Sequence, residues 1–218
     1  MEEARQRRFA PPPGAADLLL VRHGESQAAV RGTPFAMVEG QGDPALRAEG
    51  RAQARAVAER LKAMPVEAIY VTTLRRTHQT AAPLAAHLGL VPRVERDLRE
   101  VFLGDWEGGE YRFRAARGDP ACLRARERHE WGELPGAETT AALHARVRAG
   151  LTRIARAHPD RLVAVFAHGG VIGAALALAT GAPAFAFHGA ENGSISRLVI
   201  SGDAMIARGF NDVSHLSG

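Results

Sequence analysis

The longest uncharged stretch of the chain runs from Leu162 to Phe187, and His168 is its only titratable residue. Its length would be enough to span a bilayer. Its first part, Leu162–Phe166, contains β-branched and aromatic residues, a pair of glycines interrupts it, and Ala174–Ala179 is rich in alanine. Glycines and a histidine at mid-span are unfavourable in a lipid-facing helix. The stretch therefore predicts a buried strand, a turn and a buried helix.

The rest of the chain alternates in the same way between segments typical of strands and segments typical of helices. Strands are expected at 17–21, 68–72 and 93–98, helices at 48–64, 74–88 and 138–157, and a closing hairpin at 195–200 and 205–210. This βαβ order predicts a three-layer α/β/α sandwich with a mostly parallel central sheet. Ligands of such sheets bind beyond the carboxyl ends of the strands, so the chemistry is expected there.

The length of 218 residues allows one good core and is too short for two full-sized domains. Residues 1–16 begin with several arginines and contain three consecutive prolines, without the apolar region of a secretory signal. We expect a disordered arm over 1–16, and a single domain over 17–218 with a helical lid at about 108–135.

The charge balance favours small anions as ligands. The net charge is +4, a mild excess that is far from the dense basic face of a nucleic-acid binder. Lys62 is the only lysine, which excludes a P-loop, and the single Cys122 cannot form an internal disulfide. We expect a cytoplasmic protein with a small phosphorylated substrate and with no nucleic-acid or membrane partner. The oligomeric state is open, and a homodimer is one candidate.

Two histidines, His23 and His168, each follow an apolar strand and precede a glycine, Gly24 or Gly169. Glycine permits a sharp turn and lets backbone N–H groups approach an anion, and the helix that begins beyond it adds its positive end. A single histidine at a strand end is more often a buried polar residue without further function. Two such placements on one sheet edge make a phosphate site the better interpretation.

Arg22 and Arg76 supply a cationic pair for the same site. Arg76 lies where a helix is expected to begin after a third strand. Arginine binds phosphate through a planar fork and stays charged at any working pH. A surface role is the alternative, but arginine is unfavourable in the first turn of a helix because of the helix dipole.

Four segments, in this order, resemble the histidine phosphatase superfamily, which is also called the phosphoglycerate mutase-like family. They are Arg22–Glu25, Leu74–Ala81, Leu98–Glu100 with Leu103–Gly108, and Ala167–Gly170. An Arg-His-Gly triplet alone is common by chance, whereas four motifs in order are specific. The resemblance spans roughly residues 18–200.

The resemblance implies that His23 is the nucleophile that takes the phosphoryl group, and that Glu100 protonates the leaving oxygen, with Glu107 as the alternative. The implied phosphate ligands are Arg22, Arg76 and His168, which also counts as catalytic, together with Gly24, Ser26 and Gly169. Because guanidinium groups balance the phosphate charge, neither a metal ion nor a cofactor is expected.

The chain departs from the family pattern at two places. Ala29 stands where many members have an asparagine, which removes one usual phosphate contact. Thr77 follows Arg76 where alanine is usual, and Arg75 is a neighbouring candidate, although the spacing from Leu74 favours Arg76. The pair Glu138–Thr139 also resembles family positions.

Two other motifs are weaker. Cys122–Arg128 has the cysteine-to-arginine spacing of a cysteine phosphatase, but the segment looks helical and lacks the glycine-rich nest of amides. Gly169–Gly173 approaches a dinucleotide fingerprint, but His168 replaces its first glycine. The remaining histidines show no spacing typical of a metal site.

Three functions remain open: a phosphatase, a phosphoglycerate mutase-type phosphotransferase, and a non-catalytic phosphate-binding or regulatory module. Mutases of this kind usually have a longer insertion after the acid, whereas Val101–Gly108 resembles the phosphatase branch. The arginine-rich stretch 112–128 has two interpretations, a lid that binds a second anionic group or a solvated helix face. The phosphatase is the leading hypothesis.

Overall fold

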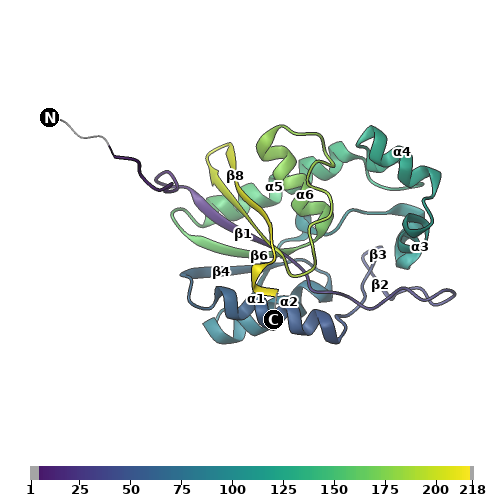
Figure 1. Ribbon diagram of the computed structural model, residues 1–218, viewed down its shortest axis with the longest axis horizontal. Helices are drawn as coiled ribbons and strands as arrows, with labels where there is room; N and C mark the ends of the chain where they lie inside the picture. The colour runs from purple at the N-terminus through teal and green to yellow at the C-terminus, as the bar shows by residue number, and fades with distance from the viewer. Residues whose placement is uncertain (1–4, 217–218) are drawn as a thin grey trace.

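The computed structural model describes residues 5–216. Its centre is a six-stranded sheet with the strand order β5-β4-β6-β1-β7-β8 (Figure 1). The bounds are β1 Ala16–Arg22, β4 Val66–Val71, β5 Arg93–Val94, β6 Leu162–Ala167, β7 Ile195–Ser201 and β8 Ala204–Asp212. Strands β5, β4, β6 and β1 are parallel, and β7 and β8 add two antiparallel strands at one side. The prediction of a mostly parallel sheet is confirmed.

Two pairs of helices cover the two faces of the sheet (Figure 1). Helices α1 (Ala48–Leu61) and α2 (Arg75–Leu88) lie on one face, and α5 (Thr140–Ala157) and α6 (Gly169–Thr180) lie on the other. The side chains of β1 alternate between the two cores, because successive residues of a strand point to opposite faces. Leu19 and Val21 pack in the α1–α2 core, whereas Leu18 and Leu20 pack in the α5–α6 core. The three-layer prediction is confirmed.

The uncharged stretch divides as its sequence predicts. Its first six residues form β6, and α6 begins directly after His168. Residues Val163–Ala167 are at most 1% exposed, since the strand lies between two neighbours and under helices on both faces. Among the described residues, no helix is long and apolar enough to cross a membrane.

The strand expected at 93–98 is shorter than predicted. Only Arg93 and Val94 pair with β4, and a 3-10 turn, η1, follows at Arg96–Leu98. The Glu95 side chain accepts the N–H of Asp97 and so stabilises this turn. The chain therefore leaves the sheet at Glu95 and passes toward the carboxyl ends of the strands.

The segment after η1 lies beyond the sheet edge (Figure 1). It contains the 3-10 turn η2 (Gly104–Gly109), helices α3 (Glu110–Ala116) and α4 (Pro120–Arg128), and the turn η3 (Trp131–Glu133). A small hairpin of β2 (Met37–Val38) and β3 (Gln41–Gly42) contacts η2. The predicted lid at 108–135 corresponds to α3, α4 and η3, and its movement stays a prediction.

The two ends of the described part of the chain lie apart (Figure 1). The last described element is the turn η4 (Ser214–Leu216). At the other end the residues before β1 project from the body, and residues 1–4 of the predicted arm lie outside the described residues. Disorder of the arm stays a prediction.

Candidate active site

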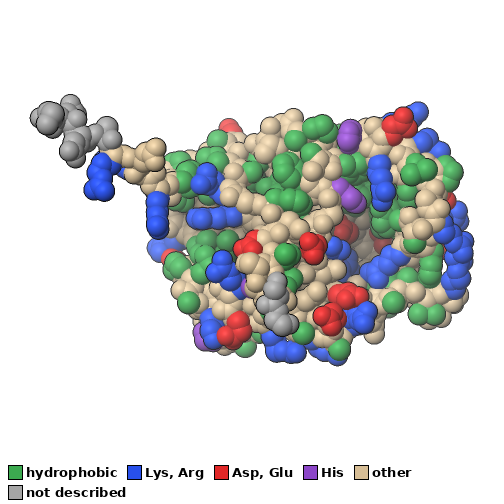
Figure 2. All heavy atoms as spheres, viewed as in Figure 1, with side chains coloured by type: hydrophobic (Ala, Val, Ile, Leu, Met, Phe, Trp, Pro, Cys, Tyr) green, Lys and Arg blue, Asp and Glu red, His purple; other side chains and the backbone are tan. Residues whose placement is uncertain are grey.

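A cavity of about 650 Å³ lies beyond the carboxyl ends of β1 and β6. Its other walls come from the β2–β3 hairpin, η2 and α3. Figure 2 shows a hollow on this side of the molecule, with basic and acidic side chains at its edge. The cavity therefore lies where a parallel sheet is expected to bind its ligand.

The end of β1 holds His23 in one orientation. Its backbone N–H donates to the carbonyl of Ala167 at 3.0 Å, and its own carbonyl accepts from Asn192 Nδ2 at 2.9 Å. The ring Nδ1 lies 2.8 Å from the carbonyl oxygen of Gly24. Because a carbonyl only accepts, Nδ1 carries the proton and Nε2 is the unprotonated nitrogen, able to accept a hydrogen bond.

The electrostatic surroundings keep His23 neutral. The side chain is buried, and burial together with the guanidinium groups of Arg76 and Arg22 holds the pKa of His23 well below its ordinary value. Arg76 Nε donates toward His23 Nε2 at 3.3 Å. The structure thus presents an unprotonated imidazole nitrogen to the cavity wall, which is the reactive form of a histidine nucleophile.

His168 stands beside His23 because β1 and β6 are parallel neighbours in matched register, with Arg22 opposite Ala167. The two ring centroids are 5.2 Å apart in an edge-on arrangement. His168 Nε2 lies 3.0 Å from Thr72 Oγ1, and its buried Nδ1 has no hydrogen-bond partner among the described residues. Burial and the charge of Arg76 lower the pKa of His168 well below its ordinary value.

Both predicted arginines reach the cavity. Arg22 donates through Nη1 to the carbonyl of Ala190, while its buried Nε has no partner within residues 5–216. Arg76 is 6% exposed and donates through Nη1 to the carbonyl of Gly42 at 3.0 Å. Burial lowers the pKa of Arg76 to about 10, so the group still carries its charge at neutral pH. Two desolvated guanidinium groups favour an anion between them.

Arg75 has a different position from its neighbour Arg76. Its Nε binds Asp43 Oδ2 at 2.7 Å, its side chain is half-exposed, and it does not line the cavity. The geometry therefore agrees with the assignment of Arg76 rather than Arg75.

Glu100 and Glu107 both line the cavity. Glu100 Oε1 accepts the N–H of Val101 at 2.9 Å and that of Gly170, in the first turn of α6, at 3.1 Å. Both carboxyl oxygens of Glu107 bind backbone amides, those of Gly42 and Leu103, at 2.8 and 3.0 Å. Burial raises the pKa of Glu107. Glu107 thus ties the β2–β3 hairpin to η2, whereas among the described residues only one of the two carboxyl oxygens of Glu100 is bound.

The structure corrects the expectation for Gly24. Its N–H donates to Thr80 Oγ1 at 3.0 Å, and Gly24 does not line the cavity. A Cβ at this position would lie 2.3 Å from the carbonyl oxygen of Gly50 in α1. Close approach of α1, rather than an anion, explains the glycine.

Ser26 and Gly169 do line the cavity. Ser26 Oγ accepts from Arg112 Nη2 at 2.8 Å. Gly169 lies against Arg22, since a Cβ there would be 3.4 Å from Arg22 Nε. Both predicted residues therefore stand beside the arginines of the site.

The arginines of the stretch 112–128 differ in position, and binding of a second anionic group by this stretch stays a prediction. Arg112 lines the cavity, donates to the carbonyl of Gln27 at 2.7 Å, and packs over Phe35. Arg114 binds Glu110 and Asp119, and Arg124 and Arg128 bind Glu133, in ion pairs with half-exposed or exposed arginines. Arg112 thus faces the site, whereas Arg114, Arg124 and Arg128 form ion pairs on the surface.

The competing motifs do not form sites. Cys122 is buried within α4, and a helix does not provide the nest of amides of a cysteine phosphatase. Burial also raises the pKa of its thiol, which disfavours the reactive thiolate. Within residues 5–216 no group of three or more His, Cys, Asp or Glu residues is placed to hold a metal ion.

Sequence reasoning gave no role to several residues that the structure brings to the site. Asn192 and Gln41 line the cavity, and Thr72 binds His168. Asn192–Gly193 before β7 is a turn signal that pointed to a loop but not to a role. Gln41 has no local signal at all. Ala29, in place of the usual asparagine, lines the cavity and lies next to Gly109.

Comparison with known proteins agrees with this geometry. Residues 18–213 match the profile of the histidine phosphatase superfamily (branch 1). The chain is 35% identical over 168 residues to a glucosyl-3-phosphoglycerate phosphatase of Mycobacterium tuberculosis, with 73% of each chain covered. It is 30% identical over 204 residues to a probable phosphoglycerate mutase of Enterobacter sp. (strain 638), with 90% of this chain and 93% of the relative covered.

A solved structure extends the likeness to the fold. The native structure of a mycobacterial glucosyl-3-phosphoglycerate phosphatase aligns with a TM-score of 0.74 at 31% identity. The alignment covers 90% of this chain and 99% of that one. The resemblance seen in four short motifs therefore holds over nearly the whole length, and the chain belongs to the histidine phosphatase superfamily, branch 1.

Proposed function

We propose that the protein is a metal-independent phosphomonoester hydrolase that acts on a small phosphorylated metabolite through a phosphohistidine at His23. The observation that carries this proposal is the unprotonated Nε2 of His23, which accepts from Arg76 at the wall of a cavity that also holds Arg22. The superfamily membership and the phosphatase named above as a relative support it.

In the first half-reaction the phosphoryl group lies between Arg22, Arg76 and His168. His23 Nε2 attacks phosphorus, the bond from phosphorus to the ester oxygen breaks, and the leaving oxygen takes a proton from Glu100. The buried guanidinium groups balance the charge on the phosphoryl oxygens, and they need no reorganisation at the moment of reaction. Glu100 suits proton transfer because it lines the cavity beside the first turn of α6.

In the second half-reaction a water attacks the phosphohistidine. The Glu100 carboxylate takes a proton from that water, the bond from phosphorus to Nε2 breaks, and inorganic phosphate leaves. His23 returns to its neutral form, which its burial favours. The enzyme thus ends in its starting protonation state.

The wall of the cavity away from His23 indicates the kind of ester. It carries several aromatic side chains, which are those of Phe35, Trp106, Tyr111, Phe113 and Trp131. A cavity of about 650 Å³ accommodates an organic group as well as the phosphate. We propose a small metabolite as the substrate, in keeping with the glucosyl-3-phosphoglycerate phosphatase relative. A cytoplasmic location, the absence of nucleic-acid and membrane partners, and a homodimer stay predictions.

A mutase is the second candidate, because the Enterobacter relative is a probable phosphoglycerate mutase. In a mutase the phosphohistidine would return its phosphoryl group to another hydroxyl of the bound substrate. That activity would appear as exchange between positions of one substrate with little net phosphate release.

The test is a panel of phosphate esters with the purified protein and with His23→Ala. We expect phosphate release from at least one ester by the unmodified protein, and a phosphoenzyme that is labile in acid and stable in alkali. Release from no ester would contradict the hydrolase. The opposite lability would contradict His23 as nucleophile, and ligand binding without any phosphoenzyme would indicate a non-catalytic module.

A further inference from the structure

The segment 99–103, which carries Glu100, belongs to no helix or strand. It connects η1 to η2 at the edge of the cavity. A proton donor must be held within a fraction of an ångström of its working position, and an irregular segment has no ladder of backbone bonds to hold it. Contacts from elsewhere in the chain must therefore position Glu100.

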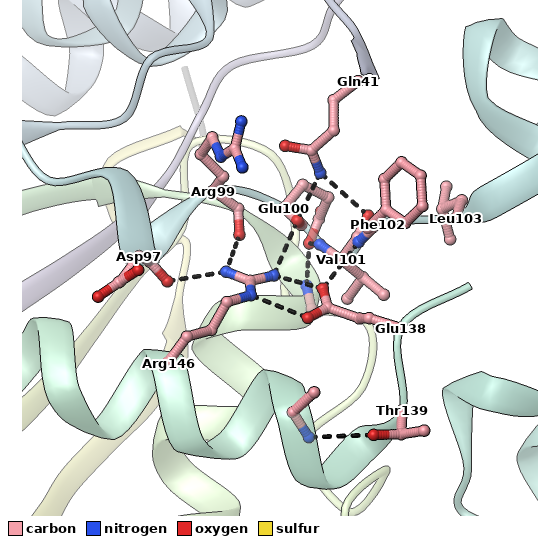
Figure 3. Close-up of polar contacts among 12 residues, drawn as sticks. Gln41, Asp97, Arg99, Glu100, Val101, Phe102, Leu103, Glu138, Thr139 and Arg146 are labelled. Carbon is pink, nitrogen blue, oxygen red and sulfur yellow. Dashed lines mark hydrogen bonds and ion pairs between the residues drawn. The ribbon is translucent and has the colours of Figure 1, made fainter. Parts of the chain in front are cut away.

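Arg146 on α5 supplies most of these contacts (Figure 3). Its Nη1 donates to the carbonyls of Asp97 and Arg99, both at 2.7 Å, and its Nη2 donates to the carbonyl of Glu100 at 3.0 Å. Nε and Nη2 also bind the carboxylate of Glu138, at 2.9 and 2.5 Å. All five N–H donors of the guanidinium are thus used, which the three donors of a lysine cannot reproduce.

Glu138 holds the segment 99–103 at a residue that follows Glu100. Its Oε1 accepts the N–H of Phe102 at 2.8 Å while it also binds Arg146 (Figure 3). The pair Arg146–Glu138 therefore fixes carbonyls before and at Glu100 and an amide two residues after it. On the opposite side, Gln41 Nε2 donates to the carbonyl of Glu100 at 2.6 Å.

The pair is well placed to act on Glu100 without touching the substrate. The side chains of Arg146 and Glu138 are 22% and 13% exposed, so their charge-assisted bonds are only partly screened by water. Neither residue lines the cavity. Glu100 itself reaches the cavity and binds the amide of Gly170.

We infer that the Arg146–Glu138 pair is a positioning device for the proton donor Glu100, an inference that rests on the proposed phosphatase function. The pair acts on protonation of the leaving oxygen and leaves phosphate binding alone. Its loss should therefore matter most for esters whose leaving group needs a proton.

The experiment compares kcat/KM for two esters in Arg146→Lys and Glu138→Gln. An alkyl phosphate has a strongly basic leaving group, whereas p-nitrophenyl phosphate has a weakly basic one that departs without a proton. We expect kcat/KM for the alkyl ester to fall about 10- to 100-fold, because a displacement of about 1 Å costs on this order. The loss for p-nitrophenyl phosphate should stay within about threefold, since general acid catalysis contributes little there.

Arg153→Lys is the matched control. Arg153 lies two turns further along α5 and pairs with the side chains of Glu95 and Asp97, but it donates to no carbonyl of the segment 99–103. Its kcat/KM ratio between the two esters should match that of the unmodified protein. Glu100→Gln combined with Arg146→Lys should lose little more than Glu100→Gln alone, because both changes affect one proton transfer.

Thermal unfolding of each variant accompanies the kinetics. Should Arg146→Lys fail to fold, Glu138→Gln, which keeps an acceptor for Phe102, gives the same comparison. Equal losses on both esters, or no loss in either variant, would overturn the inference while the phosphatase assignment stands. Absence of phosphate release by the unmodified protein would instead remove the proposed function on which the inference rests.

Discussion

The two sides of the cavity are built in different ways. On the phosphate side, Arg22 ends β1, His23 and His168 directly follow β1 and β6, and Arg76 lies in the first turn of α2. On the opposite side, the walls are the β2–β3 hairpin, the segment 99–109 and α3, which contain much irregular backbone. The first group lies in or directly after regular elements, whereas ion pairs and single side-chain bonds hold much of the second. The difference suits a constant phosphate chemistry combined with a variable organic group.

The phosphate side is tested most severely at His23. We expect His23→Ala to lower kcat at least about a thousandfold on every ester, because the proposed nucleophile is removed. Phosphate release and capture of the alkali-stable phosphoenzyme measure the effect. The exposed His87→Ala in α2 is the control and should behave as the unmodified protein. A phosphoenzyme formed by His23→Ala would show that another residue is the nucleophile.

The neighbours Arg76 and Arg75 give a second test of the phosphate side. Arg76 lines the cavity, whereas Arg75 binds Asp43 and does not line it. Arg76→Ala should lower kcat/KM about a hundredfold, as expected for loss of one buried charged donor. Arg75→Ala should change kcat/KM less than about threefold, because Arg75 does not line the cavity and its side chain binds Asp43 rather than a residue of the phosphate site. Steady-state kinetics on one ester measure both losses. A larger loss in Arg75→Ala than in Arg76→Ala would assign phosphate binding to Arg75 instead.

Gly170 links the two sides, since its amide binds Glu100 from the first turn of α6. A Cβ there would lie 2.4 Å from Val101 Cγ2 and 2.7 Å from Glu100 Oε1. Gly170→Ala should displace Glu100 and lower kcat/KM for an alkyl phosphate about tenfold or more. Gly209→Ala, where a Cβ meets nothing within 4 Å, is the control. Unchanged kinetics in Gly170→Ala would speak against Glu100 as the proton donor.

Arg112 in α3 tests the side of the cavity opposite the phosphate. We expect Arg112→Ala to raise KM about tenfold for an ester with a second anionic group such as a carboxylate, because one charge-assisted contact is lost. For p-nitrophenyl phosphate KM and kcat should change less than about threefold. Arg128→Ala, which removes an exposed ion pair with Glu133 and does not line the cavity, is the control. An equal loss on both esters would assign Arg112 to the phosphate side instead.

The smallest effect concerns stability as a function of pH. Burial lowers the pKa of His23 and of His168, so below about pH 6.5 the unfolded chain binds protons that the folded chain does not. The free energy of unfolding should therefore fall as pH decreases from about 6.5 to 5.5, by up to about 1.4 kcal/mol per pH unit for each histidine. Urea unfolding across this range measures the slope. His168→Gln should make it shallower, and an unchanged slope would mean that His168 is not held neutral.

The positions of the residues on the phosphate side were largely predictable from sequence. Apolar strands of matched length place His23 and His168 at one edge, and the spacing from Leu74 selects Arg76. The expectation for Gly24 failed because the helix packing against Gly50 is a contact between distant segments. The strand at 93–98 was too long because Glu95 caps a turn with its own side chain.

The contacts on the opposite side of the cavity were much less predictable from sequence. Gln41 and Arg146 act by donating to carbonyls more than forty residues away, and no local pattern indicates which carbonyls will need a donor. The arginine-rich stretch likewise gave no reason to separate Arg112 from Arg114, because only the packing of α3 on Phe35 and Ser26 distinguishes them. Residues that hold loops are visible only in three dimensions.

The start of α6 has a consequence for how substrate range can change. His168, Gly169 and Gly170 are consecutive, and they contact Thr72, Arg22 and Glu100 respectively. In the proposed mechanism one turn of one helix therefore sets the separation between the phosphorus atom and the proton that its leaving oxygen receives. Substitutions in α3 can reshape the space for the organic group while this separation stays constant. New esters can thus be accepted without rebuilding the reaction itself.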